Sequence, residues 1–312
     1  MAEKRRRLAR LLTLAAAAVL LLGTAGVLFV SYQTANNLIH PERILPPPTP
    51  GTLNLSYENV TFNSTDGTRL TGWWIPADST PADNRTVLFL HGFTSSKNQS
   101  LHVAPWLHGA GYNLLAFDFR AHGESEGEFT TVGDRERWDA SAAAGYLQTR
   151  PDLVGCAPSC PFALMGWSMG GAVALLVAPD LPHLQAVVVD SPFSTLREAS
   201  ANAFTYFTGL PRWPFGPIAV WFAEQETRAD LDQVTPVESI GRLRAPLLMI
   251  HGTADPVAPP SEHDRLKAAA EANGVPLTAW MVRDAAHVRG HGIVPEEYEQ
   301  RVVAFLLREM PP

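Results

Sequence analysis

The sequence predicts an α/β domain built on a mostly parallel, doubly wound sheet. Six short, uninterrupted apolar runs recur along the chain, which is typical of strands buried on both faces of a parallel sheet. Helix-like stretches alternate with these runs, as they do in βαβ units. The composition agrees with this fold class, because 46% of the 312 residues are hydrophobic and 18% are charged, the balance of a globular chain with a sizeable core.

The amino-terminal residues differ in charge from the rest of the chain. Residues 1–10 form a basic segment with a net charge of +4, whereas the whole chain carries −7, which leaves −11 for residues 11–312. An acidic body of this kind disfavours a nucleic-acid groove, so we expect no nucleic-acid partner.

A membrane anchor is predicted at residues 11–30. This segment carries no charge, and its 20 residues, at a rise of about 1.5 Å each, cover the roughly 30 Å hydrocarbon core of a bilayer. The basic residues before it favour an amino terminus on the inside, which places the rest of the chain on the extracytoplasmic side of the cell membrane. We therefore predict an uncleaved signal anchor. The alternative is a cleaved signal peptide and a secreted protein.

Residues 31–51 are predicted to form an extended linker. They contain five prolines, three of them consecutive, as suits a solvated spacer between a membrane and a domain. The folded domain is then expected over residues 52–312.

The elements of that domain follow one another in a regular order. Two β-prone runs flank Asp66-Gly67, a dipeptide typical of a tight hairpin. The six apolar runs predict strands at 86–90, 114–119, 162–165, 186–189, 247–250 and 278–282. Helices are predicted at about 97–110, 134–149, 169–178, 259–273 and 295–309.

The strongest functional signal is the sequence GWSMG at residues 166–170. It has the form G-x-S-x-G and lies directly between a predicted strand and an apolar helix. Glycines on both sides of Ser168 permit the sharp turn that holds a serine hydroxyl above the carboxyl end of a sheet. The motif therefore predicts that Ser168 is a nucleophile.

A carboxylate and a histidine follow Ser168 in the order that this kind of sheet requires. Asp255 and His287 each follow a predicted strand. We expect His287 to act as the base and Asp255 to orient it. Asp190 also follows a strand and is the rival for the acid; its alternative role is to stabilise the loop that begins at Ser191.

Donors for a developing oxyanion are expected on the main chain. The strand 86–90 runs into His91-Gly92-Phe93, so the backbone N–H of Phe93 can converge with that of Met169, the residue after the serine. His91 is expected to brace this loop through local hydrogen bonds rather than to titrate in catalysis.

Together these motifs resemble the α/β-hydrolase fold superfamily, especially its membrane-anchored bacterial esterases and serine aminopeptidase-like members. The resemblance covers about residues 55–310, through HGFTSSK at 91–97, DFRAHGESEG at 118–127, GWSMGG at 166–171, HGTADPVAP at 251–259 and AHVRGHGIVPEEYEQRVVAFL at 286–306. It implies the α/β-hydrolase fold, no metal and no organic cofactor. It also implies Ser168 as nucleophile, Asp255 as acid, His287 as base, and Phe93 with Met169 as oxyanion hole. One departure is Val288-Arg289 after the histidine, where the family has a small residue.

A cap insertion is expected at about residues 193–235. It is rich in aromatic residues: Phe193, Phe204, Tyr206, Phe207, Trp213, Phe215, Trp221 and Phe222. An aromatic cap over the crevice would suit an apolar acyl or aryl group. The alternative is that these rings pack the cap's own core.

Two cysteines, Cys156 and Cys160, lie just before the strand that leads to the serine motif. No cluster of histidines or cysteines lies nearby in the sequence, and the predicted compartment is oxidising. We therefore expect a small disulfide that braces the loop rather than a metal site.

The predicted function is that of a serine hydrolase that cleaves carboxylic ester or thioester bonds of a small-molecule substrate with an apolar acyl or aryl group, through an acyl-enzyme. Two alternatives remain. One is a serine peptidase, aminopeptidase or amidase that uses the same three residues. The other is a non-catalytic, membrane-tethered binding module on a hydrolase fold.

Overall fold

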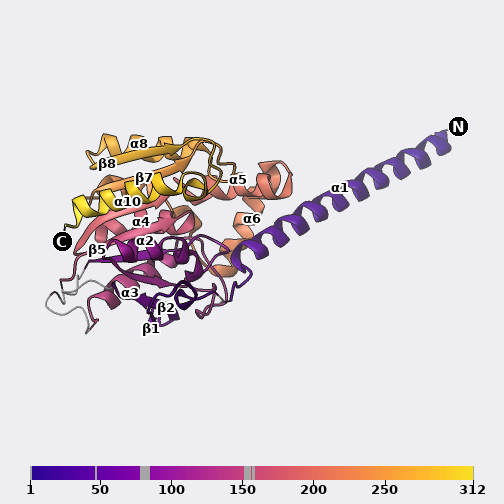
Figure 1. Cartoon of the computed structure of the whole chain (residues 1–312). Helices are drawn as coiled ribbons and strands as arrows, with labels where there is room; N and C mark the ends of the chain where they lie inside the picture. Colours follow the sequence, from indigo (N-terminus) through magenta and orange to yellow (C-terminus); the bar gives the residue numbers. More distant parts are fainter. Residues whose placement is uncertain (1, 46–47, 78–84, 151–155, 157–158, 312) are drawn as a thin grey trace.

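A central sheet of eight strands organises the molecule (Figure 1). The computed structural model describes residues 2–45, 48–77, 85–150, 156 and 159–311. The strand order is β1-β2-β4-β3-β5-β6-β7-β8. β2 runs antiparallel to both of its neighbours, and all other adjacent strands are parallel. This arrangement is the predicted α/β-hydrolase fold.

Each strand overlaps a run that the sequence predicts. The strands are β1 (Glu58–Asn63), β2 (Arg69–Ile75), β3 (Thr86–Leu90), β4 (Asn113–Phe117), β5 (Phe162–Trp167), β6 (Leu184–Asp190), β7 (Leu247–Gly252) and β8 (Leu277–Val282). Every residue of β3, β4, β5 and β7 is buried, which explains their uninterrupted apolar sequences. The β1–β2 turn places Gly67 at φ +88°, a conformation that favours glycine.

Helices cover both faces of this sheet. One face packs against α2 (Ala104–Gly109) and α10 (Pro295–Glu309). The other face packs against α3 (Glu136–Leu147), α4 (Met169–Val177) and α8 (Pro260–Ala272). The remaining short elements are η1 (Pro50–Leu53), η2 (Lys97–His102), η3 (Ala178–Asp180), η4 (Leu231–Gln233), α7 (Pro236–Ser239), η5 (Ile240–Arg242) and α9 (Gly290–Ile293). The two hydrophobic cores hold the strand ends in fixed positions.

The cap insertion after β6 is helical. It contains α5 (Leu196–Thr208) and α6 (Arg212–Thr227), and α6 is kinked near its start at Trp213. The rings of Phe204 and Phe215 stack with their centroids 5.9 Å apart. Aromatic residues of the cap therefore pack against one another, as the alternative interpretation of this segment expects.

The amino-terminal helix is longer than the sequence analysis predicts. α1 (Ala2–Ile39) includes the apolar segment 11–30, almost all of it exposed, and has the length and composition to cross a membrane. It then continues through residues 31–39, so the prediction of an extended linker is wrong for these residues. The physical reason is that helix-breaking prolines begin only at Pro41. Residues 46–47 of the predicted linker lie outside the described residues.

The end of α1 packs against the cap. Ser31, Ala35 and Ile39 recur every four residues on one helix face, and all three are buried. The Ser31 hydroxyl donates a hydrogen bond of 3.1 Å to the carbonyl oxygen of Phe215 in α6. Figure 1 shows α1 leaving the body of the protein beside α6. The apolar segment is therefore joined to the cap by a docked helix and not by a free spacer.

A disulfide bond joins Cys156 to Cys160. Gln148, just beyond α3, holds the loop from the other side, because its side chain accepts from the Cys160 N–H at 2.8 Å and donates to the Cys160 carbonyl oxygen at 3.0 Å. Residues 157–158 between the cysteines lie outside the described residues.

Candidate active site

Ser168 lies in a sharp turn between β5 and α4. Its backbone has φ +53° and ψ −117°, which is a strained conformation for any residue other than glycine. Glycines make the turn possible. A Cβ at Gly166 would clash with the carbonyl oxygen of Gly170, and a Cβ at Gly170 would clash with that of Leu90 in β3. The turn holds the serine hydroxyl above the carboxyl end of the sheet, with the first turn of α4 behind it.

A chain of hydrogen bonds runs from Ser168 through His287 to Asp255. His287 Nε2 lies 2.8 Å from Ser168 Oγ, and His287 Nδ1 lies 2.7 Å from Asp255 Oδ2. The other carboxylate oxygen accepts from the N–H groups of Val257 and Ala258 at 2.9 and 2.8 Å. These bonds fix the buried carboxylate, so it orients the imidazole with Nε2 toward the serine. The structure thus brings together the three residues predicted to form a triad.

Asp190, the rival for the acid, is engaged elsewhere. Its carboxylate accepts hydrogen bonds from the hydroxyls of Ser191 at 2.9 Å and Tyr298 at 3.0 Å. Burial raises the pKa of Asp190 to about 6, although both hydrogen bonds oppose the shift. The Ser191 hydroxyl also accepts from the N–H of Val288 at 3.2 Å. Asp190 therefore supports the loop that carries His287, and in the described residues no hydrogen bond joins it to that histidine.

Two main-chain donors lie beside the nucleophile. The N–H groups of Phe93 and Met169 donate to no other group within the described part of the chain. The loop of Phe93 runs close to the serine, since a Cβ at Gly92 would lie 3.5 Å from the Ser168 Cβ. Gln99 holds this loop by accepting from the Gly92 N–H at 2.8 Å. Two unpaired N–H groups beside a nucleophile are what a developing oxyanion requires.

His91 braces the same loop, as the sequence analysis predicts. It is fully buried; its Nε2 accepts from the Phe119 N–H at 3.0 Å, and its Nδ1 lies 2.8 Å from the Gly92 carbonyl oxygen. Burial lowers the pKa of His91 well below its usual value, so the ring is neutral near pH 7.

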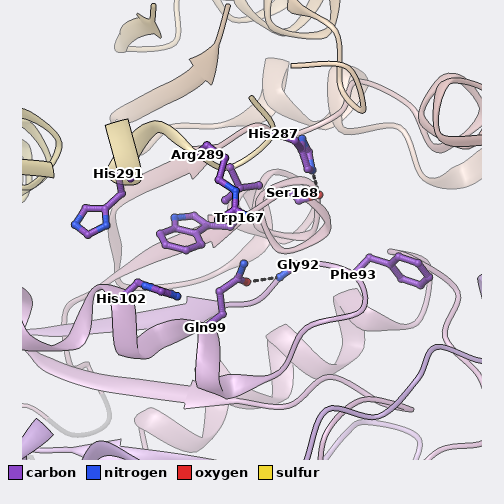
Figure 2. A pocket seen from close by; sticks show the side chains of 11 residues that line it. Gly92, Phe93, Gln99, His102, Trp167, Ser168, His287, Arg289 and His291 are labelled. Carbon is purple, nitrogen blue, oxygen red and sulfur yellow. Dashed lines mark hydrogen bonds between the residues drawn. The ribbon is translucent and has the colours of Figure 1, made fainter. Parts of the chain in front are cut away.

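A pocket of about 340 Å³ lies over Ser168. The ends of β3, β5 and β8 and the segments after them supply its lining: Gly92, Phe93, Gln99, His102, Trp167, Ser168, His287, Val288, Arg289, His291 and Gly292. Figure 2 shows Phe93 on one side of Ser168 and Arg289, His291 and His102 on the other. The pocket therefore has two chemically different sides.

No motif in the sequence assigns Gln99, His102, Arg289 or His291 to the site. The one signal that points to them is position, because they lie within 12 residues of the end of β3 or β8, where ligands bind in such sheets. Of the cap aromatics whose side chains the structure describes, none lines the pocket. The expectation that these rings surround the substrate is thus not met.

The described residues contain one group of carboxylates close enough together to share a cation: Glu224, Asp230 and Asp232 in the cap. Arg197 already neutralises Asp232 through a hydrogen bond of 2.7 Å. These residues lie outside the pocket over Ser168, and we assign no metal to them.

Comparison with known families identifies the chain. A family model described as "Serine aminopeptidase, S33" matches residues 81–236, half of the sequence. The chain belongs to this family. The matched region of the hydrolase runs from just before β3 to the end of the cap and includes Ser168, whereas Asp255 and His287 follow it.

Relatives extend the likeness over most of the chain. The Pyrococcus furiosus esterase Pf2001 is 32% identical, with a TM-score of 0.73, over 88% of this chain and 98% of that one. Protein YfhR of Escherichia coli K12 is 29% identical over 265 residues, which are 82% of this chain and 83% of YfhR. The Arabidopsis thaliana "alpha/beta hydrolase domain-containing protein WAV2" is 25% identical over 237 residues, 74% of this chain and 72% of WAV2. These likenesses support a hydrolase throughout the folded domain.

Proposed function

We propose that this hydrolase cleaves carboxylic ester or thioester bonds through an acyl-enzyme intermediate. The observation that carries the proposal is the aligned chain of Asp255, His287 and Ser168, with contacts of 2.7 and 2.8 Å. Beside it lie the main-chain N–H groups of Phe93 and Met169, which have no acceptor within the described residues. Folding alone needs neither this alignment nor the strained backbone of Ser168. For that reason a non-catalytic binding module is disfavoured.

The reaction proceeds in two halves. His287 Nε2 takes the hydroxyl proton as Ser168 Oγ attacks the carbonyl carbon, and the N–H groups of Phe93 and Met169 hold the oxyanion. Collapse of this intermediate breaks the ester or thioester bond, and His287 gives its proton to the departing alcohol or thiol. Water then loses a proton to His287 and attacks the acyl-enzyme, which releases the acid and restores the serine hydroxyl. Asp255 accepts the hydrogen bond from His287 Nδ1 and stabilises the imidazolium.

The substrate is proposed to carry an apolar acyl or aryl group. Phe93, Trp167 and Val288 form apolar walls of the pocket and take the role that the sequence analysis gave to the cap. The likeness to an esterase of known structure supports ester substrates.

Amide or peptide cleavage is the second candidate, because the family model is named for aminopeptidases. An aminopeptidase must bind the free α-ammonium group of its substrate, for which a carboxylate is the usual partner. Among the described residues that line the pocket, none is Asp or Glu. This favours the ester reaction.

We further propose that α1 anchors the hydrolase in the cell membrane with its amino terminus inside and the catalytic domain outside. Residues 11–30 support this by length and lack of charge, and the basic residues before them support the orientation. The alternative is a signal segment that is cleaved to release a secreted protein.

The test is labelling of the full chain in detergent with a fluorophosphonate probe. Wild type and the control Ser261→Ala, an exposed serine on α8, are expected to label, whereas Ser168→Ala is expected not to label. Matched ester, thioester and amide substrates then separate the two candidate reactions. Absence of labelling in a folded wild-type protein would contradict the proposed mechanism.

A further inference from the structure

One side of the pocket is rich in hydrogen-bond donors. Arg289, His102, His291 and Gln99 lie there, and the described lining contains no acidic residue, although the chain as a whole carries a net charge of −7. A pocket of this composition favours an anionic group over a neutral or cationic one.

Arg289 is the charged group of this side. Within the described part of the chain, its guanidinium has no ion pair or hydrogen bond, in contrast to the arginines that are paired with carboxylates elsewhere. Figure 2 shows its side chain between those of His291 and Ser168. An unpaired guanidinium is well suited to bind a carboxylate or phosphate through two parallel hydrogen bonds.

The backbone before Arg289 is strained. Val288 has φ +54°, a conformation that a β-branched residue rarely adopts. The bond from its N–H to the Ser191 hydroxyl and the bond from the Arg289 N–H to the Ala286 carbonyl oxygen, at 3.0 Å, hold the turn. The turn keeps both Val288 and Arg289 in the pocket lining, two residues or fewer after His287. Strain maintained directly after His287, in residues that line the pocket, indicates a functional placement of this turn.

The neighbouring groups add donors. Because Gln99 Oε1 accepts from the Gly92 N–H, the orientation of the amide is fixed, and Figure 2 shows its nitrogen directed toward Trp167. Burial lowers the pKa of His102, and the positive charges of His291 and Arg289 lower it further. A bound anion would offset part of this local positive charge. The nearby Glu299 carboxylate is held by His291 Nε2 at 2.9 Å.

We propose that Arg289 and its neighbours bind an anionic group of the substrate, a carboxylate or a phosphate, attached a few atoms from the scissile ester. The substrate class is then an ester with an apolar part toward Phe93 and an oxyanion toward Arg289. This inference rests on the proposed ester hydrolysis and adds to it the charge that the substrate carries.

The experiment compares esters that differ only in charge, with the full chain in detergent. One pair is 4-acetoxybenzoate and 4-acetoxybenzamide; the other is a 1-acylglycerol 3-phosphate and the matching 1-acylglycerol. The measured quantity is the ratio of kcat/KM between the anionic and the neutral member of each pair. We expect wild type to prefer the anionic member of at least one pair, and that pair identifies the oxyanion as carboxylate or phosphate.

Arg289→Gln is expected to lower this ratio by about tenfold or more, mainly through KM, since a charged hydrogen bond is lost. Arg289→Lys should restore part of the ratio. Arg283→Gln is the matched control, because Arg283 lies in the same loop with 92% of its side chain exposed and outside the pocket, and its ratio should equal that of wild type. Equal turnover of both members, or a preference that Arg289→Gln leaves unchanged, would overturn the proposal.

A binding measurement separates this proposal from the proposed reaction. Ser168→Ala is titrated calorimetrically with 4-acetoxybenzoate, with 4-acetoxybenzamide and with the two glycerol esters. Tighter binding of an anionic member by this variant, without ester turnover by wild type, would support the anion subsite and contradict the hydrolase mechanism. Ester turnover without any preference for charge would support the mechanism and contradict the subsite.

Discussion

At the scale of single residues, the two candidate acids have different environments. Asp255 bonds His287 directly at 2.7 Å, whereas Asp190 bonds Ser191 and Tyr298. We predict that Asp255→Asn lowers kcat for an ester by about 10²- to 10⁴-fold, because the imidazole loses its orientation and its counter-charge. Asp190→Asn should cost less than about tenfold. Steady-state kinetics of both variants checks this, and a larger loss in Asp190→Asn would show that the acid is Asp190.

Asp190 also predicts a pH dependence of stability. Folding raises its pKa from 3.8 to about 6, so the protonated form is favoured in the folded state. Its favourable contribution is therefore complete below pH 3.8 and is lost as the pH rises through about 6. In Asp190→Asn this pH dependence disappears. The free energy of unfolding of the variant, relative to that of wild type, should therefore be up to about 3 kcal/mol higher at pH 7.5 than at pH 4. Urea unfolding of both proteins at pH 4 and pH 7.5 measures their free energies of unfolding. The same change with pH in both proteins would contradict the prediction.

Sequence alone places some site residues much better than others. Ser168 is predictable because the glycines around it are required by the sharp strand-to-helix turn, which few other structures contain. Asp255 and His287 are predictable from their order and from the strands before them. Arg289 is not predictable, since a single arginine in a loop forms no pattern. The direction of its side chain depends on the strained Val288 and on the Ser191 hydroxyl, which lies 97 residues before Val288 in the chain.

At the scale of elements, the turn between β5 and α4 depends on close contact with β3. A Cβ at Gly170 would clash with the Leu90 carbonyl oxygen, whereas one at Gly145 in α3 meets nothing within 4 Å. We predict that Gly170→Ala destabilises the fold by about 1–3 kcal/mol through overpacking and lowers ester turnover. Gly145→Ala is the control and should stabilise the fold by about 0.5–1 kcal/mol. Chemical denaturation measures the free energy of unfolding of both variants. Equal changes in the two variants would contradict the role of Gly170.

The central strands β3, β4, β5 and β7 are predictable because burial on both faces leaves a continuous apolar sequence. The run at 278–282 is a strand as well, but it lies in the edge strand β8, where Val282 alone is buried. The end of α1 is less visible, because residues 31–39 (SYQTANNLI) are mostly polar and adjoin the prolines of the predicted linker. Its buried residues are Ser31, Ala35 and Ile39, and the half-exposed Tyr32 adds a ring contact with Phe222 of α6 at 5.5 Å between centroids. A helix face this narrow cannot be seen in the sequence of α1 alone. It becomes visible only with its partner α6 of the cap, which lies far away in the sequence.

At the scale of the whole molecule, the site, the cap and the amino-terminal helix all lie toward the carboxyl ends of the parallel strands. Ser168 follows the carboxyl end of β5, the cap follows that of β6, and α1 packs on the cap. The apolar segment 11–30 therefore has a fixed attachment to the cap, which follows the strand adjacent to β5. In a membrane-anchored chain, this attachment would hold the catalytic domain close to the bilayer surface.

Two truncations test how much this attachment contributes to the fold. A chain that begins at residue 31 keeps the docked helix end, whereas a chain that begins at residue 41 removes it and uncovers the surface of α6 around Phe215 and Phe222. The shorter chain loses the buried Ala35 and Ile39 and the bond from the Thr130 N–H to the Ile39 carbonyl oxygen, 2.8 Å. We therefore expect it to be less stable by about 2–4 kcal/mol. The longer chain is the control for removal of the apolar segment. Thermal unfolding of the two, side by side, gives the comparison, and equal midpoints would show that α1 rests on the cap without stabilising it.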